Sequence, residues 1–370
     1  MKYNSVYSGN KDVSVAVNEI QDQLSDMSPK AVLYFSTSNH DPEALATAMK
    51  QAFPASECFG CTTAGEITTG KMLDDSLVAM AFSDEVIEDM HTVLIGDIQN
   101  VHDAVSKVND EMSEHFGKPF SELDYKEYVG ILLIDGLSGA EEQVIEKIGD
   151  VANIKIVGGS AGDDLKFKQT HVFHNRKAAS NAAVLCIMKP KVTFDVIKTQ
   201  SFVSTEKTMT VTKTNEAARE VIEFNGQPAA TEYSKALETT VDDLAAKAFR
   251  NPLGIMVTED EPFVRSPRMV QDDSVFFYCS VKEGMELNIL SPTDIISDTA
   301  MAIEEKKKQL GGISAIINFH CILRTLELKE DNKTDAYGKI FKDIPSIGFS
   351  TYGECYLGHI NQTSTMLVFG

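Results

Sequence analysis

Three short glycine-rich segments carry the side chains best placed for chemistry. Residues 60–66 (GCTTAGE) and 348–354 (GFSTYGE) share the pattern G-x-[ST]-T-x-G-E, and residues 158–163 (GGSAGD) are a shortened relative. Two glycines around small hydroxyl residues are typical of a strand end where the backbone passes close to another backbone or to a ligand. The segments therefore predict either tight packing of paired strands in a duplicated fold or the walls of a pocket, with Glu66 and Glu354 as polar anchors.

Two enzymatic motifs are approached but not completed. Residues 158–162 fit the G-x-S-x-G nucleophile elbow, but residues 163–172 have the pattern of a loop and a strand, whereas the elbow requires a helix. Residues 65–71 approach a phosphate-binding loop, but Met72 stands where a Ser or Thr must reach the magnesium ion. The sequence therefore favours a binding protein over an enzyme.

Cys58 and Cys61 have the spacing of a zinc or redox pair. A thioredoxin-like redox site needs the pair at the start of a helix, and no helix is expected after Cys61. Tetrahedral zinc needs two further ligands, for which Cys321 and Cys355 are available. A zinc or redox site on these four cysteines is an alternative to ordinary buried thiols.

Histidine offers a third chemistry, because one imidazole facing an apolar pocket is enough to hold a haem iron. His359 follows the glycine-rich segment at residues 348–354. His171 and His174 lie in one expected strand and, being three residues apart, point to opposite faces. His320 ends an apolar strand, where a core histidine is commoner than a ligand. The residues permit haem without establishing it.

The elements that position these residues alternate between strands and helices in the first part of the chain, which predicts an α/β fold. Residues 155–213 are nearly all strand with short turns, which favours antiparallel pairing. Further elements are a strand at 31–37, helices at 41–53, 101–116, 140–152, 216–224 and 292–310, and a strand at 313–319. We expect two related halves with mixed, largely antiparallel sheets covered by helices, arranged for example as a layered α-β-β-α sandwich. The expected divisions are an N-terminal arm at 1–27, a first domain at 28–215 and a second at 216–370.

Charge and hydropathy limit the partners. The chain has 34 Lys plus Arg against 55 Asp plus Glu, a formal net charge of -21, with no basic block. Nucleic acid and anionic lipid surfaces are therefore poor partners. The longest apolar runs fall short of the ~18 residues that indicate a membrane span, and the polar first dozen residues lack a signal peptide. We expect a cytoplasmic protein with reduced cysteines and no membrane insertion.

Six segments, in this order, resemble FIST-domain sensory proteins over nearly the whole chain. They are residues 58–67 (CFGCTTAGEI), 157–175 (VGGSAGDDLKFKQTHVFHN), 220–237 (EVIEFNGQPAATEYSKAL), 319–328 (FHCILRTLEL), 348–354 (GFSTYGE) and 359–363 (HINQT). The first two segments resemble the FIST N domain and the others the FIST C domain.

The resemblance implies an intracellular, non-enzymatic sensory module that binds a small molecule or a gas. Because the chain ends at Gly370 without an effector, we expect it to signal in trans to a histidine kinase or a cyclic-di-GMP enzyme. The ending is most similar to the NosP group of haem-binding nitric-oxide sensors. That similarity implies non-covalent haem b, with His359, His174 or His171 as the axial ligand. The sequence leaves the oligomeric state open, with a homodimer as one alternative.

A haem-free sensor of a small polar metabolite such as an amino acid is the competing interpretation. Glu66 or Glu354 would then meet an ammonium group and Arg324 a carboxylate, whereas with haem Arg324 could pair with a propionate. A salt bridge from Arg324 to Glu327 is the structural alternative. The pocket candidates are Gly60, Cys61, Thr62, Gly65, Glu66, Ser160, Arg324, Ser350, Thr351, Tyr352, Gly353, Glu354 and Asn361.

Overall fold

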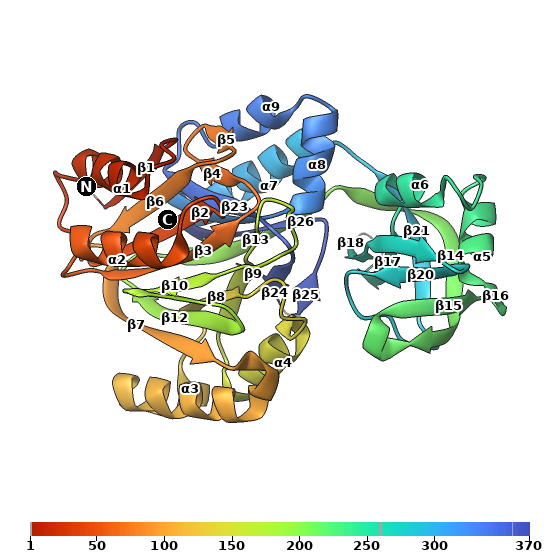
Figure 1. The fold of residues 1–370 in the computed structure, drawn as a ribbon, viewed down its shortest axis with the longest axis horizontal. Helices are drawn as coiled ribbons and strands as arrows, with labels where there is room; N and C mark the ends of the chain where they lie inside the picture. The colour runs from red at the N-terminus through yellow and green to blue at the C-terminus, as the bar shows by residue number, and fades with distance from the viewer. Residues whose placement is uncertain (1, 259–260, 357) are drawn as a thin grey trace. The chain divides into compact units, whose positions relative to one another are not determined.

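The computed structural model describes residues 2–258, 261–356 and 358–370 (Figure 1). The chain forms two compact units. The first unit contains Met1–Thr199, Thr299–His359 and Ser364–Gly370, and the second contains Gln200–Asp298 and Ile360–Thr363. The second unit is thus inserted into the chain of the first, and the boundary expected near residue 215 falls inside it.

The first unit repeats one chain pattern three times: strand, helix, strand, helical crossover, strand, hairpin, strand. Copy one contains β1 (Tyr3–Ser8), α1 (Val13–Gln23), β2 (Ala31–Thr37), α2 (Pro42–Ala52), β3 (Glu57–Thr63), β4 (Glu66–Thr68), β5 (Lys71–Leu73) and β6 (Leu77–Phe82). Copy two contains β7 (Ile87–Gly96), α3 (Val101–Phe116), β8 (Val129–Ile134), α4 (Glu141–Val151), β9 (Lys155–Ser160), β10 (Val172–His174), β11 (Lys177–Ala179) and β12 (Ala182–Pro190). Copy three contains β13 (Phe194–Gln200), α7 (Ile295–Leu310), β22 (Ala315–Cys321), α8 (Ile322–Glu330), α9 (Thr334–Lys339), β23 (Ser346–Thr351), β24 (Glu354–Tyr356), β25 (His359–Ile360) and β26 (Thr363–Phe369). The insertion falls between β13 and α7 of copy three.

Each copy gives its hairpin to the sheet of another copy. The three sheets have the strand orders β1-β6-β2-β3-β10-β11, β7-β12-β8-β9-β24-β25 and β13-β26-β22-β23-β4-β5. In each sheet the two strands joined by the helical crossover are parallel, as between β2 and β3, β8 and β9, and β22 and β23. The hairpin β4–β5 therefore completes the sheet of copy three, β10–β11 that of copy one, and β24–β25 that of copy two.

Local sequence explains why the elements of copy one form. In β2 (AVLYFST), Leu33 and Phe35 face the central core while Tyr34 packs on the opposite face, as the two-residue period of a strand requires. The helix α2 begins at Pro42, and the Asp41 side chain caps it by accepting from the backbone N–H of Ala44 at 2.8 Å. A crossover helix of this kind is what parallel neighbours need.

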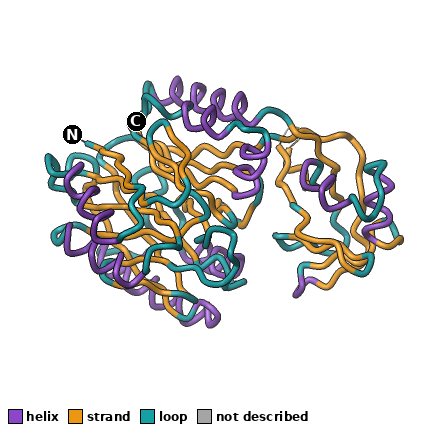
Figure 2. The backbone as a smooth tube through the Cα atoms, turned by 45° about the horizontal axis from the view of Figure 1, so that its top comes forward, coloured by secondary structure: helices purple, strands orange, loops and turns teal. Residues whose placement is uncertain are grey.

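One central core lies between the inner faces of the three sheets, since it contains residues from β2, β8 and β22 together. Two outer cores lie beneath helices, one with α1 and α2 and one with α3 and α4. The helices lie outside the strands, as Figure 2 shows for this unit. The mixed α/β class with helix-flanked sheets is confirmed, at 28% helix and 41% strand. The repetition in the first unit is threefold, where the sequence indicated two related halves, and three sheets share the core.

The second unit has its own strand path, β18-β17-β21-β14-β15-β20-β19, and its own core. Its elements are β14 (Phe202–Asn215), β15 (Glu220–Phe224), β16 (Gln227–Pro228), α5 (Ala229–Ala236), α6 (Leu244–Arg250), β17 (Leu253–Thr258), β18 (Glu261–Arg265), β19 (Pro267–Gln271), β20 (Ser274–Phe277) and β21 (Glu286–Pro292). The helix expected at 216–224 is wrong. Only a 3₁₀ turn forms, at Glu216–Ala218, because Arg219 adopts a left-handed conformation (φ 53°), and β15 follows.

Within the described residues, no helix has the length and apolar character needed to cross a membrane.

Candidate functional site

The first glycine of each glycine-rich segment is required by the parallel strand beside it. A Cβ at Gly60 would lie 1.7 Å from the carbonyl oxygen of Tyr34. The equivalent distances are 1.8 Å from Gly158 to Leu132 O and 2.2 Å from Gly348 to Asn318 O. Real atoms do not approach so closely, so only glycine fits at these three positions. They are structural positions, one in each copy.

The structure brings all three segments together, and they bond to one another through their backbones. The hydrogen bonds are Ser350 N to Gly65 O (2.7 Å), Ala64 N to Ser350 O (3.2 Å), Gly162 N to Thr62 O (2.9 Å), Asp164 N to Thr63 O (2.9 Å), Ser160 N to Gly353 O (2.8 Å) and Tyr352 N to Ser160 O (3.2 Å). Every pair of copies is linked. We call the three glycine-rich segments the bends. Packing of paired strands therefore accounts for the bends, including Gly60, Gly65 and Gly353, without a ligand.

The hydroxyl groups of the bends also have partners inside the fold. Thr351 Oγ1 donates to Ser160 O at 2.8 Å, and Ser350 Oγ and Thr325 Oγ1 lie 2.8 Å apart. Thr62 Oγ1 accepts from the backbone N–H of His171 at 3.0 Å. These candidate side chains thus stabilise the junction of the copies.

Glu66 is a fully buried carboxyl group. Its oxygens accept from Ser76 N (3.0 Å) and Ser76 Oγ (2.6 Å), and it is hydrogen-bonded to Thr63 Oγ1. Burial raises the pKa of Glu66 to about 8 against the lowering effect of these bonds. Glu354 is also fully buried and pairs with Gly159 between β24 and β9. Both are internal residues of the bends.

Arg324 lies in the first turn of α8 and is 1% exposed. Its Nη2 donates to Thr299 Oγ1 on α7 at 3.1 Å. Asn361 is equally buried, in the second unit, where its Oδ1 accepts from Cys279 Sγ at 2.6 Å. The two candidates are each held by protein contacts within their own unit.

The four cysteines of the zinc or redox alternative do not lie in one cluster. Cys61 faces the central core, whereas Cys58 lies in the outer core on the opposite face of β3. Cys321 ends β22 in one sheet and Cys355 lies on β24 in another. Across the described residues, no group of three or more His, Cys, Asp or Glu side chains could hold a metal ion. Burial raises the pKa of Cys58 and of Cys355 to about 12, which opposes formation of a thiolate.

Two of the three haem-ligand candidates have polar surroundings. His174 Nε2 lies 3.0 Å from Thr92 Oγ1, beside the carboxylate of Glu57. His171 is half-buried, and burial lowers its pKa although the carboxylates of Asp135 and Glu43 oppose this effect. These residues do not fit the apolar face that haem requires. His359 is the most buried of the three candidates, at 9% exposed.

A hollow of about 220 Å³ lies at the carboxyl end of β2, the edge of a parallel pair where α/β proteins commonly bind ligands. It is lined by Lys11, Thr37, Asn39, His40 and Asp75. Among the described residues, Lys11 makes no hydrogen bond or ion pair. The hollow therefore combines an unpaired ammonium group with a carboxylate and two uncharged polar side chains.

The lining of the hollow is held in place by internal hydrogen bonds. His40 is 3% exposed, with Nδ1 2.8 Å from Ser36 Oγ and Nε2 2.9 Å from Asn10 O. The Asn39 amide donates to Asp75 Oδ1 at 2.5 Å. These contacts fix the positions of the His40 ring and of the Asp75 carboxylate.

The equivalent strand ends in the other two copies are built differently. In copy two the end of β8 is occupied by Asp135, which accepts from Leu137 N at 3.0 Å and Asn181 N at 2.5 Å. In copy three α8 begins directly after β22, whereas residues 38–41 separate β2 from α2 in copy one. The strand end in copy one therefore differs from that of copy two in its residues and from that of copy three in the length of the loop that follows.

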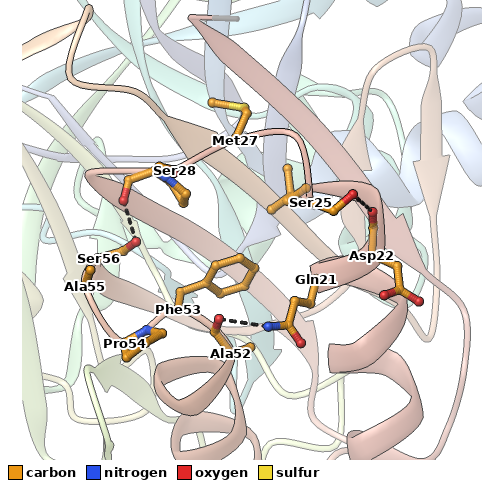
Figure 3. A pocket seen from close by; sticks show the side chains of 12 residues that line it. Gln21, Asp22, Ser25, Met27, Ser28, Ala52, Phe53, Pro54, Ala55 and Ser56 are labelled. Carbon is orange, nitrogen blue, oxygen red and sulfur yellow. Dashed lines mark hydrogen bonds between the residues drawn. The ribbon is translucent and has the colours of Figure 1, made fainter.

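Two other hollows are less suited to a charged ligand. One of about 470 Å³ lies at the ends of α1 and α2, where Gln21, Met27 and Phe53 surround it (Figure 3). Asp22 is the single ionisable residue that lines it in the described chain. The other, about 510 Å³, is a groove between the edge strand β7 and α3 with three carboxylates and Lys107.

Sequence reasoning missed the hollow at β2. Its lining residues come from three separate stretches of chain, and each has an ordinary context in the sequence. Only the turn around Asn39 and His40, directly after a buried strand, could have drawn attention to it.

The fold defines a class of mixed α/β proteins in which three copies exchange hairpins around one core and carry an inserted second unit. Residues 30–227 match the FIST N domain and residues 229–356 match the FIST C domain. The chain therefore belongs to the FIST family, whose domains are associated with sensing small ligands in signalling. The family resemblance of the sequence is confirmed, and its NosP-like refinement remains a prediction.

The chain is also similar to an uncharacterized protein of Methanocaldococcus jannaschii, MJ1623, with 24% identity over 277 residues. That match covers 70% of this chain and 53% of the other protein. The chain thus spans about half the length of this relative.

Proposed function

We propose that this chain is a sensory protein that binds, without transforming it, a small metabolite carrying both a positive and a negative charge, such as an amino acid. The observation that carries the proposal is the presence of both Lys11 and Asp75 in the lining of one hollow of about 220 Å³. The opposite charges of these two side chains match the two charged groups of a zwitterion.

The geometry suggests how such a ligand would be held. Its carboxylate would pair with the Lys11 ammonium group, and its own ammonium group with Asp75. Thr37 and Asn39 would supply further hydrogen bonds. Charge-assisted hydrogen bonds of this kind are stronger than neutral ones, so the two charged residues would dominate recognition.

The signal would pass to a separate partner, a histidine kinase or a cyclic-di-GMP enzyme, as the family resemblance implies. Nitric-oxide sensing through haem b is the competing proposal. Its support is the burial of His359, the most buried of the three candidate ligands.

The experiment is a screen of the standard amino acids by thermal unfolding, followed by calorimetric titration of those that stabilise the chain. A ligand at a hundredfold excess over its Kd stabilises a folded protein by about 2.7 kcal/mol. We expect Lys11→Gln and Asp75→Asn to weaken binding about tenfold or more, and the matched exposed controls Lys2→Gln and Asp26→Asn to leave it unchanged.

Two results would contradict the proposal. In one, none of the amino acids shifts the unfolding temperature. In the other, binding is the same in the Lys11 and Asp75 variants as in the controls. An absorbance spectrum after haem addition tests the competitor: a Soret band that is lost in His359→Ala and shifts with nitric oxide would favour haem.

A further inference from the structure

Residues 163–169 form a loop that exposes apolar side chains between positive charges. Phe167 is 60% exposed and Leu165 is 39% exposed. Lys166 and Lys168 flank them on an exposed stretch of a chain whose formal net charge is -21. The loop also contains Asp163 and Asp164, but these are buried and partly buried, so its exposed side chains at 165–168 are apolar or positively charged.

The backbone of this loop is strained at the residues that carry these side chains. Asp164, Leu165 and Phe167 have φ values of 54°, 61° and 51°, in the left-handed region where glycine is favoured. A turn of this shape needs no Leu or Phe, and neither side chain gains full burial in return. Strained residues of this kind cluster at functional sites.

Two residues hold the loop in this conformation. Asp163, 1% exposed, accepts from the backbone N–H groups of Phe167 (2.9 Å), Lys168 (2.6 Å) and Gln169 (3.0 Å). The Tyr352 hydroxyl donates to Asp163 Oδ1 at 2.6 Å and accepts from Leu165 N at 2.9 Å. The Phe167 ring stacks on Tyr352 with centroids 5.2 Å apart. The loop is thus preorganised, which reduces the entropy lost on binding.

The loop is also tied to the residues beside the hollow at β2. Asp164 Oδ2 accepts from Thr37 Oγ1 at 2.9 Å and from Ser38 N at 2.8 Å. Lys166 Nζ donates to Asn39 Oδ1 at 2.6 Å. Thr37 and Asn39 line the hollow, so the loop contacts two residues of the candidate ligand site.

We propose that residues 163–169 are a docking surface for a separate protein, one that offers an apolar helix face to Phe167 and Leu165 with carboxylates beside it. Charge complementarity gives this partner its sign, because Lys168 is exposed and has no ion pair among the described residues, whereas Lys166 lies 3.8 Å from Asp164. Loop-to-loop pairing of two copies would bring four lysines together. The inference holds whatever the ligand of the hollow is.

The test uses a fluorescein-labelled amphipathic helical peptide with leucines on one face and glutamates on the other, and a second peptide with lysines for glutamates. We expect the full chain to bind the glutamate peptide and not the lysine peptide. Phe167→Ala and Lys168→Glu should each raise the Kd about tenfold or more. Met301→Ala, at a side chain 63% exposed on α7, is the matched control and should have no effect.

Leu165→Gly separates docking from folding. Glycine relieves the left-handed strain, so this variant should unfold at the same or a higher temperature while it binds the glutamate peptide more weakly. A loop with a purely structural role would show no loss of binding. The proposal is overturned if the glutamate peptide fails to bind, if both peptides bind equally, or if the loop variants bind like the control. Light scattering adds one more outcome: a dimer that Phe167→Ala dissociates would mean that a second copy is the occupant.

Discussion

The imidazole ring of His359 lies directly against the backbone of Gly353. A Cβ at position 353 would stand 2.1 Å from Cε1 and 2.8 Å from Nε2 of that ring. The glycine that follows Tyr352 in the third bend therefore makes room for the histidine of β25. The two residues pack directly against each other, so a substitution at either one changes the packing of the other.

Gly353→Ala should consequently destabilise the protein. Overpacking of a closed site costs about 1–3 kcal/mol of unfolding free energy, which urea denaturation can measure. Gly96→Ala is the matched control, because a Cβ at Gly96 has nothing within 4 Å. Adding His359→Ala to Gly353→Ala should recover part of the loss. A double variant whose effect is the plain sum of the single ones would contradict the contact.

Gly158→Ala should have a larger effect than Gly353→Ala. Its Cβ would meet the carbonyl oxygen of Leu132 at 1.8 Å, and a backbone atom in a parallel strand pair cannot move aside as a ring can. We expect little folded protein, measured as the soluble yield and the near-ultraviolet circular dichroism. A folded variant of wild-type stability would show that β8 and β9 are not paired in this register.

Glu66 predicts a dependence of stability on pH. Its folded pKa of about 8 lies above the ordinary value of 4.5, because burial favours the neutral form. As the pH rises from about 4.5 to 8, the unfolded chain loses this proton while the folded chain keeps it, so the free energy of unfolding falls. One such proton contributes a slope of at most about 1.4 kcal/mol per pH unit.

Glu66→Gln removes this loss, because the amide does not ionise and can donate to Thr63 Oγ1. Its unfolding free energy relative to the wild type should therefore increase across that pH interval. The exposed Glu85→Gln should show no such trend. A constant difference between Glu66→Gln and the wild type at all pH values would mean that Glu66 is ionised in the folded protein.

Tyr352→Phe removes one hydroxyl group that both donates to Asp163 and accepts from Leu165 N. We expect faster hydrogen exchange at the backbone amides of residues 165–169, with the rest of the first unit unchanged. Loss of a buried hydrogen bond to a charged group costs about 1.5–3 kcal/mol, so the unfolding free energy should also fall. Tyr125→Phe, at a side chain 48% exposed, is the control. Equal exchange in both variants would show that Asp163 holds the loop alone.

The six cysteines should be unreactive in the folded protein, since all of them are buried. Ellman's reagent should label none under native conditions and all six in denaturant. Rapid native labelling of Cys58 and Cys61 together would revive the redox interpretation that their opposite faces of β3 argue against.

Helices and strands whose apolar residues recur with a regular spacing could be predicted from the sequence. The strand at 31–37 and the helix at 101–116 were predicted at their observed bounds, because the burial pattern of β2 and the apolar stripe of α3 are both local properties. The prediction of a helix at 216–224 was wrong because Arg219 adopts a left-handed conformation that ends it. An arginine side chain gives no indication of that conformation in the sequence.

The threefold repeat could be predicted only in part. The glycines of all three bends were recognised, yet the second unit separates β13 from the rest of copy three and conceals the repeat. The hollow at β2 depends on contacts between residues far apart in the chain, such as Asn39 with Asp75, which no local pattern encodes. The strained loop likewise needs Tyr352, nearly two hundred residues away, to hold it.

Because the copies exchange hairpins, each of the three sheets in the first unit contains strands from two copies. A fragment cut between the two family regions, after residue 227, would keep β4–β5 but lose β22 and β23, the strands that this hairpin extends, and it would leave β9 without β24. We therefore expect that neither region folds on its own. The two pieces should become ordered only when they are produced together, so the boundary drawn from sequence families is not a place where this protein can be divided.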